Sequence, residues 1–437
     1  MLPLLLSLCA LAGGYENPPE EIARILDASR PPAVSISPDN QVMAMMERPQ
    51  LAPIAEFAAP VVRVAGMQLN PVLRERARSY TYRGLALKGL DRSEPVAVAM
   101  PSDARMGNVS WSPDSKHMAF TLAHEDGLAL YTVNVQTRAI SKLSEPGLSA
   151  VSGSPCSWAP DSTALYCKVV PGELGPMPEA DPVPAGPKID ENLGRKTPAR
   201  TYTNLLGSTH DEAVFTWIMT SAVDRIALDG TRTRVAEPAL IDDFDISPDG
   251  THAILATIHP PFSYHVPASR FPVRWELMDL GEGTRKQLAD LPLADDIPVA
   301  FGSVRQGPRF YAWRPDQPAT MYWVEALDGG DAGKESAERD AVYQQPVGGE
   351  QSLVWKTSLR YGGITWADED TAMASEWWWQ TRTEKSHRID PSVEGGAAQL
   401  LWERDYQDAY LDRGSPVMTQ GPMGAWSCAR PRMVGCI

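Results

Sequence analysis

A short turn sequence that recurs along the chain constrains its fold most. The clearest copy is Trp111-Ser112-Pro113-Asp114, which leads directly into the hydrophobic run 117–122. Proline fixes φ at the second turn position and aspartate can bond the backbone just ahead, so each copy predicts a tight turn before a strand. Related copies are Ser37-Pro38-Asp39, Trp158-Ala159-Pro160-Asp161, Ser247-Pro248-Asp249 and Trp313-Arg314-Pro315-Asp316, with a worn copy at residues 366–370.

The segments after these turns predict antiparallel meanders. In the second unit, the run 117–122 is followed by the strand-like residues 128–135, a short turn and a further strand at 139–143. One such meander is the content of a propeller blade, and its repetition indicates a repeat fold. The sequence therefore predicts an all-β protein, a β-propeller of about six to seven four-stranded antiparallel blades that is incomplete at its C-terminus.

The composition is that of a globular protein with many turns. The 437 residues include 39 prolines and 33 glycines, and 43% of them are hydrophobic. With 40 Lys and Arg against 55 Asp and Glu, the formal net charge is −15. This charge disfavours nucleic acid or an anionic membrane surface as a partner.

Both ends of the chain differ from the middle. Residues 1–14 contain an apolar run with small residues at Ala10 and Ala12, which is typical of a signal peptide, although no Lys or Arg precedes the run. We therefore expect a periplasmic or secreted protein. Residues 15–418 are expected to form the propeller. Residues 419–437 show no strand pattern and are interpreted as an atypical tail, out of frame or disordered.

Three segments are expected to leave the blade pattern. Residues 20–26 are typical of a short helix, and residues 49–83 form a long insertion rich in arginine. Six prolines lie between residues 171 and 187. This segment should cross the surface as an extended loop, because proline cannot donate a hydrogen bond within a sheet. The strand pattern is expected to resume with Val214-Phe215-Thr216-Trp217.

Two of the five cysteines, Cys156 and Cys167, flank the Trp158 turn on strands that should be adjacent. An exported protein can form a disulfide between them, and two buried unpaired thiols are the alternative. No cysteine or histidine group has the spacing of a zinc site, so we expect neither a metal nor another cofactor.

Motifs of enzyme catalysis are missing from the sequence. The sole Gly-x-Ser, Gly147-Leu148-Ser149, is followed by Val151 where the closing glycine of a nucleophile elbow would stand. The sequence has neither a glycine-rich phosphate loop nor His-Glu-x-x-His. His259 and His265 share an unusual proline-rich loop and are interpreted as structural. Residue chemistry alone therefore indicates a binding or gating scaffold.

Several longer stretches are specific enough to suggest a relationship. They are residues 18–27, 258–264, 270–272, 291–301, 303–305, 327–332 and 359–364. These stretches resemble the glutamyl endopeptidases of the prolyl oligopeptidase family, and the likeness extends over roughly residues 15–418. The resemblance implies an N-terminal β-propeller that caps a C-terminal α/β-hydrolase domain, which carries a catalytic Ser, Asp and His. This chain resembles the propeller, truncated before the hydrolase domain, and matches no residue of that triad.

The resemblance also implies a function. The chain would be the substrate-gating propeller of an exported serine endopeptidase that cleaves after acidic residues, and would be inactive alone. Preference for acidic residues implies arginines near the peptide, because a guanidinium grips a carboxylate in two places. The candidates are Arg74, Arg76 and Arg78 in the insertion and Arg305 within a family stretch. Surface or inter-blade salt bridges are the alternative role of each.

Two other functions stay open at this stage. One is a stand-alone periplasmic propeller that binds a protein or peptide partner. The other is an enzyme with its active site on the propeller face, although no cluster of carboxylates or histidines indicates one. An incomplete ring would expose the apolar side of a blade, so self-association through that edge is expected. A peptide substrate would be reached through the missing hydrolase domain.

Overall fold

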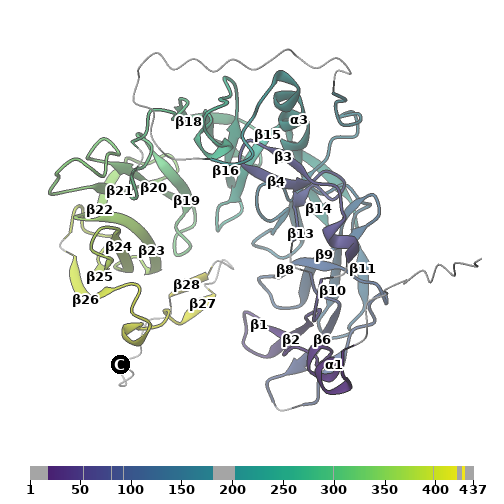
Figure 1. Cartoon of the computed structure of the whole chain (residues 1–437). Coiled ribbons are helices and arrows are strands. Elements are labelled where there is room, and N and C mark those ends of the chain that lie inside the picture. The colour runs from purple at the N-terminus through teal and green to yellow at the C-terminus, as the bar shows by residue number, and fades with distance from the viewer. Residues whose placement is uncertain are drawn as a thin grey trace, which may run out of the picture.

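The computed structural model describes residues 18–420 and 426–428, except for residues 53, 80, 92, 181–201, 299 and 397. The expected signal peptide and most of the expected tail lie outside the described residues. Within them, the regular structure is mainly β-strand, neighbouring strands pair antiparallel, and the sheets follow one another along an arc (Figure 1). The prediction of an all-β propeller is confirmed.

The described residues form six blades of four antiparallel strands. Four of them are separate sheets, and the other two share the long strand β15 within one seven-stranded sheet. The first two blades contain β1 (Ala33–Ile36), β2 (Val42–Glu47), β6 (Gly84–Gly89), β7 (Val96–Ala97), and β8 (Met106–Trp111), β9 (His117–His124), β10 (Gly127–Asn134), β11 (Ile140–Lys142). The next two contain β12 (Cys156–Trp158), β13 (Ala164–Val169), β14 (Thr220–Ala227), β15 (Arg232–Ile246), β16 (His252–Ile258), β17 (Val273–Asp279) and β18 (Arg285–Leu291). The last two contain β19 (Arg309–Trp313), β20 (Thr320–Ala326), β21 (Asp340–Pro346), β22 (Ser352–Thr357), and β23 (Arg360–Asp368), β24 (Thr371–Trp378), β25 (Thr383–Ile389), β26 (Gln399–Asp405).

The recurring turn joins the first and second strands of every one of these blades. In three blades its serine, Ser37, Ser112 or Ser247, is completely buried. The serine hydroxyl donates to the aspartate of the same turn over 2.6 to 2.7 Å. It also accepts a bond from the first backbone N–H of the second strand over 2.9 to 3.0 Å. The motif therefore fixes the turn and satisfies buried polar groups at once.

The same motif also links neighbouring blades. The indole of Trp111 donates to Ser35 Oγ in the first blade over 2.9 Å. The indole of Trp313 donates to the carbonyl of Asp245 in the fourth blade over 3.0 Å. In these two copies the tryptophan of the motif therefore connects neighbouring blades.

A small three-stranded sheet is inserted between β2 and β6 of the first blade. The arginine-rich insertion folds into the helix α2 (Ile54–Phe57) and the strands β3 (Val62–Val64), β4 (Met67–Asn70) and β5 (Glu75–Arg76). Its buried face, which includes Met67 and Leu69, shares one hydrophobic cluster with Phe215 and Phe271 from the third and fourth units. The insertion is therefore packed onto the propeller and is not a loose loop.

The expected strand at Val214-Phe215-Thr216-Trp217 is wrong, because these residues lie in the helix α3 (Thr209–Met219). Ser208 caps the helix by accepting a bond from the Asp211 N–H over 3.2 Å. Asp211 and Glu212 in the first turn also suit the positive end of the helix dipole. An apolar run of this length fits a strand or a buried helix, and here the cap and the shared cluster favour the helix.

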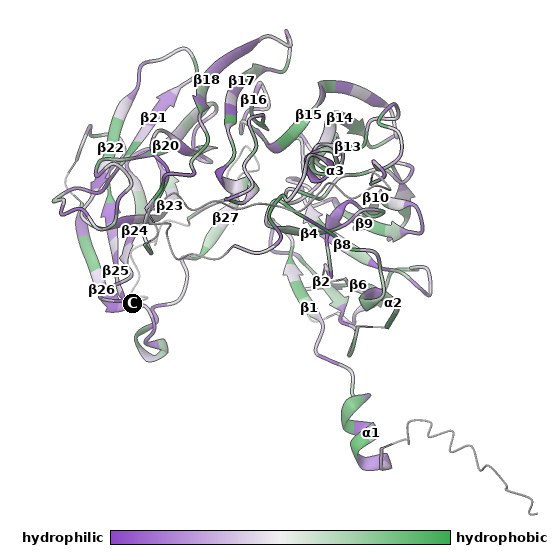
Figure 2. Ribbon diagram, turned by 45° about the horizontal axis from the view of Figure 1, so that its top comes forward, coloured by the Kyte–Doolittle hydropathy of each residue, from purple (hydrophilic) through white to green (hydrophobic). Residues whose placement is uncertain are grey.

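The described ends carry short elements. The helix α1 (Glu20–Leu26) was predicted; none of its residues is buried, and it stands apart from the blades (Figure 2). After the last blade come the 3-10 turn at Ala409–Leu411 and a hairpin of β27 (Met418–Gln420) and β28 (Trp426–Cys428). The strand β28 lies in the segment 419–437, where the sequence showed no strand pattern. Across the described residues we find no helix long and apolar enough to cross a membrane.

Cys156 and Cys167 lie directly opposite each other on β12 and β13. Their sulfurs are 2.09 Å apart in a disulfide, which is one of the two alternatives that the sequence left open. Cys167 is completely buried in a cluster between the second and third blades. The disulfide thus joins the first two strands of the third blade beneath its turn.

Candidate functional site

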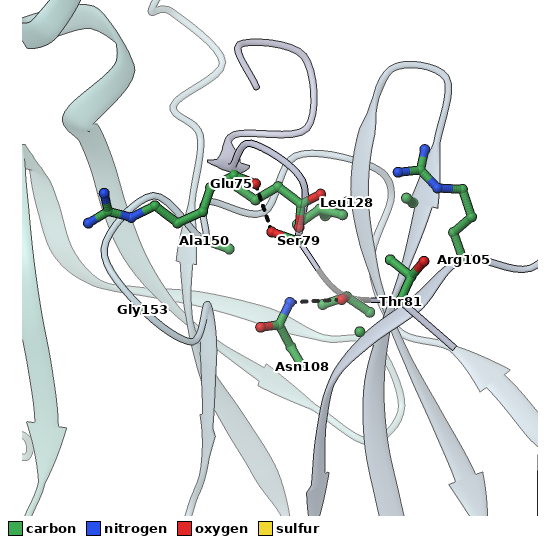
Figure 3. Close-up of a pocket in the computed structure, with 12 residues that line it drawn as sticks. Glu75, Ser79, Thr81, Arg105, Asn108, Leu128, Ala150 and Gly153 are labelled. Carbon is green, nitrogen blue, oxygen red and sulfur yellow. Dashed lines mark hydrogen bonds between the residues drawn. The ribbon is translucent and has the colours of Figure 1, made fainter. Parts of the chain in front are cut away.

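A cavity of about 390 Å³ opens between the insertion sheet and the second and third blades (Figure 3). Its size is within the range of small-ligand sites in proteins. Both charged and polar side chains face it. It is lined by Glu75, Arg76, Ser79, Thr81, Arg105, Gly107, Asn108, Thr121, Ala123, Leu128, Ala150 and Gly153.

The insertion brings Glu75 and Arg76 to this cavity through the short strand β5. The preceding turn is held by Asn70, whose side chain accepts bonds from the N–H groups of Val72 and Leu73, each over 3.0 Å. Ser79 Oγ then donates to the carbonyl of Arg76 over 2.7 Å. These local bonds fix the backbone that carries both charged side chains.

The second blade supplies the opposite wall through an irregularity in β8. Its pairing with β9 shifts between Gly107 and Ser110, and Asn108 has a φ of 47°. A bulge of this kind turns a side chain away from the regular ladder. The side-chain NH2 of Asn108 donates to Thr121 Oγ1 over 3.0 Å (Figure 3). Among the described residues, the side-chain oxygen of Asn108 makes no hydrogen bond and is open to other contacts.

The charges at the cavity are only partly paired. Arg105 Nε lies 3.6 Å from the Glu56 carboxylate but makes no hydrogen bond, and Glu56 is also held by Arg83 over 3.0 Å. Within the part of the chain that the structure describes, the guanidinium of Arg76 has neither a hydrogen bond nor an ion pair. Free guanidinium N–H groups beside a cavity can bind a carboxylate.

Among the described residues, Glu75 is the one carboxyl that lines the cavity. It is only 8% exposed. Burial raises the pKa of the Glu75 carboxyl, and Ser79 and Arg105 partly oppose this rise. A buried carboxylate is costly, so the site favours a neutral Glu75 more than water does. The cavity therefore has a positive bias that grows as Glu75 takes up a proton.

Of the four arginines that the sequence selected, only Arg76 lines this cavity. Arg74 is 4% exposed and donates to the carbonyls at the end of α3: Trp217 over 3.0 Å, Ile218 over 3.2 Å and Thr220 over 3.4 Å. Its guanidinium also stacks 4.0 Å above the ring of Trp217. Burial lowers the pKa of Arg74 to about 10, which leaves it charged at neutral pH. Arg74 thus caps a helix.

The other two arginines lie elsewhere. Arg78 is exposed, with its guanidinium 5.3 Å from the centre of the Phe57 ring. Arg305 donates to the carbonyls of Pro292 over 2.7 Å and Phe271 over 3.5 Å, and burial lowers its pKa. Arg305 therefore holds two loops of the fourth unit together.

Arg105 and Asn108 line the cavity but were not selected from the sequence. Neither belongs to a motif, and the bulge that turns Asn108 has no sequence signal beyond Gly107. The described residues contain no group of three or more His, Cys, Asp or Glu side chains that could hold a metal ion.

Comparison with known proteins identifies relatives of the chain. It is 36% identical over 436 residues to a probable chloroplastic glutamyl endopeptidase of Oryza sativa subsp. japonica, a match that covers 95% of this chain and 46% of the relative. The corresponding protein of Arabidopsis thaliana is 34% identical over 439 residues, covering 96% and 45%. The chain is a homologue of the glutamyl endopeptidases. It spans about half the length of these relatives, and the resemblance read from its sequence is confirmed.

Other comparisons concern the fold or give no match. No family model matches this glutamyl endopeptidase homologue. Among solved structures, a prolyl endopeptidase aligns with 14% identity and a TM-score of 0.44, covering 79% of this chain and 43% of that one. An oligogalacturonate lyase from Vibrio parahaemolyticus aligns with 12% identity and a TM-score of 0.42, covering 84% of each chain. Neither alignment bears on activity.

Proposed function

We propose that this chain is the substrate-gating propeller of a serine endopeptidase that cleaves after acidic residues. The observation that carries the proposal is the 36% identity to a glutamyl endopeptidase over 95% of the chain. The sequence given has no Gly-x-Ser-x-Gly elbow, so no nucleophile for acyl transfer can be assigned within it. The catalytic serine is accordingly assigned to a separate part of the enzyme.

A propeller placed before a hydrolase site acts as a wall with limited openings. It excludes folded proteins and bulk water, and it admits peptides or unfolded segments. The cavity at Arg76 and Arg105 supports a more specific role, because it offers guanidinium groups in a chain whose overall charge is negative. An acidic peptide would otherwise be repelled by the net charge of −15.

We also propose that the protein is exported. The disulfide between Cys156 and Cys167 supports this, because such bonds persist mainly in oxidising compartments. A reporter fused behind residue 30 and assayed on both sides of the membrane tests the proposal. Activity confined to the cytoplasmic side would contradict it.

A chimaera tests the gating function. The segment of the rice relative that matches this chain is replaced by the chain itself, and cleavage of a short glutamyl peptide and of a folded protein is measured. We expect the peptide to be cleaved and the folded protein to survive. The chain alone is the matched control and should cleave neither. A folded chimaera that degrades both substrates at similar rates would contradict a gating role.

A further inference from the structure

Two further cavities adjoin the candidate site. One of about 200 Å³ is lined by Gly66, Arg76, Ser152, Asp242 and Pro267, among others. Another of about 290 Å³ is lined by Asp103, Arg105, His124 and Glu125, among others. Arg76 lines both the first of these and the central cavity, and Arg105 lines both the second and the central cavity. The three cavities therefore form a row, and each junction between two of them is lined by an arginine.

The charges change along this row. The central cavity holds the two arginines and the nearly buried Glu75. Each flanking cavity shares one of these arginines and adds acids of its own: Asp242 in one, and Asp103 and Glu125 in the other. Asp103 and Glu125 are exposed and make no ion pair within the described residues. Asp242 accepts a bond from Ser152 Oγ over 2.5 Å and is half-buried.

We propose that the three cavities form one groove for an extended peptide, with an acidic side chain between Arg76 and Arg105 and basic side chains in the two flanking cavities. A lone small anion would need only the central cavity and would leave the flanking acids without a role. A uniformly acidic peptide would meet Asp103, Glu125 and Asp242 at its ends. The alternation of charge therefore selects a peptide whose acidic residue lies between basic ones. This inference rests on the proposed function, since it specifies which acidic peptides the propeller admits.

Peptide spacing follows from the geometry of an extended chain. Side chains at positions i, i+2 and i+4 of a strand point to the same side. The probe is therefore a fluorescein-labelled Lys-Ala-Glu-Ala-Lys peptide. Its partners are Lys-Ala-Gln-Ala-Lys, which lacks the central charge, and Glu-Ala-Glu-Ala-Glu, which reverses the flanking charges. Binding to the full chain is followed by fluorescence anisotropy at low salt.

We expect the Lys-Ala-Glu-Ala-Lys peptide to bind about tenfold more tightly than either of the other two peptides. A tenfold difference in Kd corresponds to the loss of one charge-assisted bidentate contact between a carboxylate and a guanidinium. Arg76→Gln should abolish this discrimination. Arg78→Gln is the matched control, an exposed arginine two residues away that lines none of the cavities, and it should change Kd less than about twofold. Circular dichroism melts confirm that both variants fold.

Equal Kd values for the three peptides would contradict the proposed peptide groove. An equal effect of Arg76→Gln and Arg78→Gln on the Kd of Lys-Ala-Glu-Ala-Lys would contradict it as well. The chimaera separates this failure from failure of the proposed function. If the chimaera cleaves glutamyl peptides and excludes folded proteins while the three peptides bind equally, gating stands and the groove is wrong. If the peptides are discriminated and the chimaera shows no gating, the groove stands as a peptide site of another function.

Discussion

The backbone N–H of Asp114 donates to Ser162 Oγ over 3.0 Å, so the Pro-Asp turn of the second blade is bonded directly to that of the third. The same bond recurs one blade earlier, where the Asp39 N–H donates to Ser115 Oγ over 3.0 Å. Ser115 and Ser162 both adopt a left-handed φ, 61° and 60°. The residue that closes each turn therefore reaches back to the turn before it.

Ser162→Ala is expected to loosen the contact between these two blades. The change leaves the Asp114 N–H without its partner in a part-buried hydrogen bond, which costs about 1 kcal/mol of unfolding free energy. Urea unfolding followed by tryptophan fluorescence measures the loss. Ser157→Ala, at an exposed position on β12, is the control and should change stability by less than about 0.5 kcal/mol. Equal stability of the two variants would show that the bond between the turns contributes little.

The blades could be predicted from the sequence because each contains the same local turn motif between its first and second strands. Proline fixes one dihedral of the turn, and the serine and aspartate bond within five residues of each other, so little depends on distant parts of the chain. The worn copy at residues 366–370 still marks the turn between β23 and β24. The helix α3 could not be predicted this way, because burial against the insertion sheet decides between helix and strand for such a run.

Arg74→Ala should destabilise the protein, whereas Arg76→Ala should not. Loss of Arg74 leaves the final carbonyls of α3 without their donor in a buried place, at a cost of about 2–3 kcal/mol. Arg76 makes no such contacts, and its change should stay within about 0.5 kcal/mol. Thermal melts and urea titrations of the two variants compare them directly. A larger loss for Arg76→Ala would reverse the assignment of the two roles.

The contrast between these arginines explains why the site was only partly predictable. Arg74, Arg76 and Arg78 occupy alternate positions in the sequence, and nothing in that spacing distinguishes a buried arginine from an exposed one. The left-handed turn at Arg74, with φ 49°, and the pairing of β5 with β4 decide which of them is buried. Arg105 comes from another blade, and no local pattern connects it with the insertion.

Removal of the disulfide should lower stability without changing the fold. The two cysteines are 11 residues apart, and closing a loop of this length stabilises a protein by about 2–3 kcal/mol in the chain-entropy description. The double variant Cys156→Ser, Cys167→Ser is therefore expected to unfold at lower urea. Reducing agent should produce the same shift in the unmodified chain and no further shift in the variant. Cys428→Ser, outside the disulfide, should leave this response to reductant intact.

Exposed apolar residues on the first blade lead us to expect self-association. Val34 and Ile36 point to the same side of β1 and are 52% and 43% exposed. Pairs of this kind on a sheet face favour contact with another apolar surface. Sedimentation velocity over a range of concentrations should show reversible oligomers that weaken in the Val34→Thr, Ile36→Thr variant. A monomer at every concentration would contradict the expectation.

The last prediction concerns Glu75 and pH. Burial raises the pKa of Glu75, while Arg105 opposes the rise and Glu56 adds to it. An acidic side chain bound beside Arg76 would be repelled by ionised Glu75 and not by its neutral form. Binding of Lys-Ala-Glu-Ala-Lys should therefore strengthen as the pH falls through the raised pKa of Glu75. It should weaken again near pH 4.3, the ordinary pKa at which the glutamate of the peptide itself is protonated.

Glu75→Gln isolates this effect because it keeps the shape of the side chain and removes its charge. At pH 7 the variant should bind the peptide about threefold more tightly than the unmodified chain, and its Kd should stay flat between pH 7 and about 5. Glu350→Gln, an exposed acid on a distant blade, is the matched control and should keep the original pH profile. A profile that persists in Glu75→Gln would assign the titration to another group and contradict the role of Glu75.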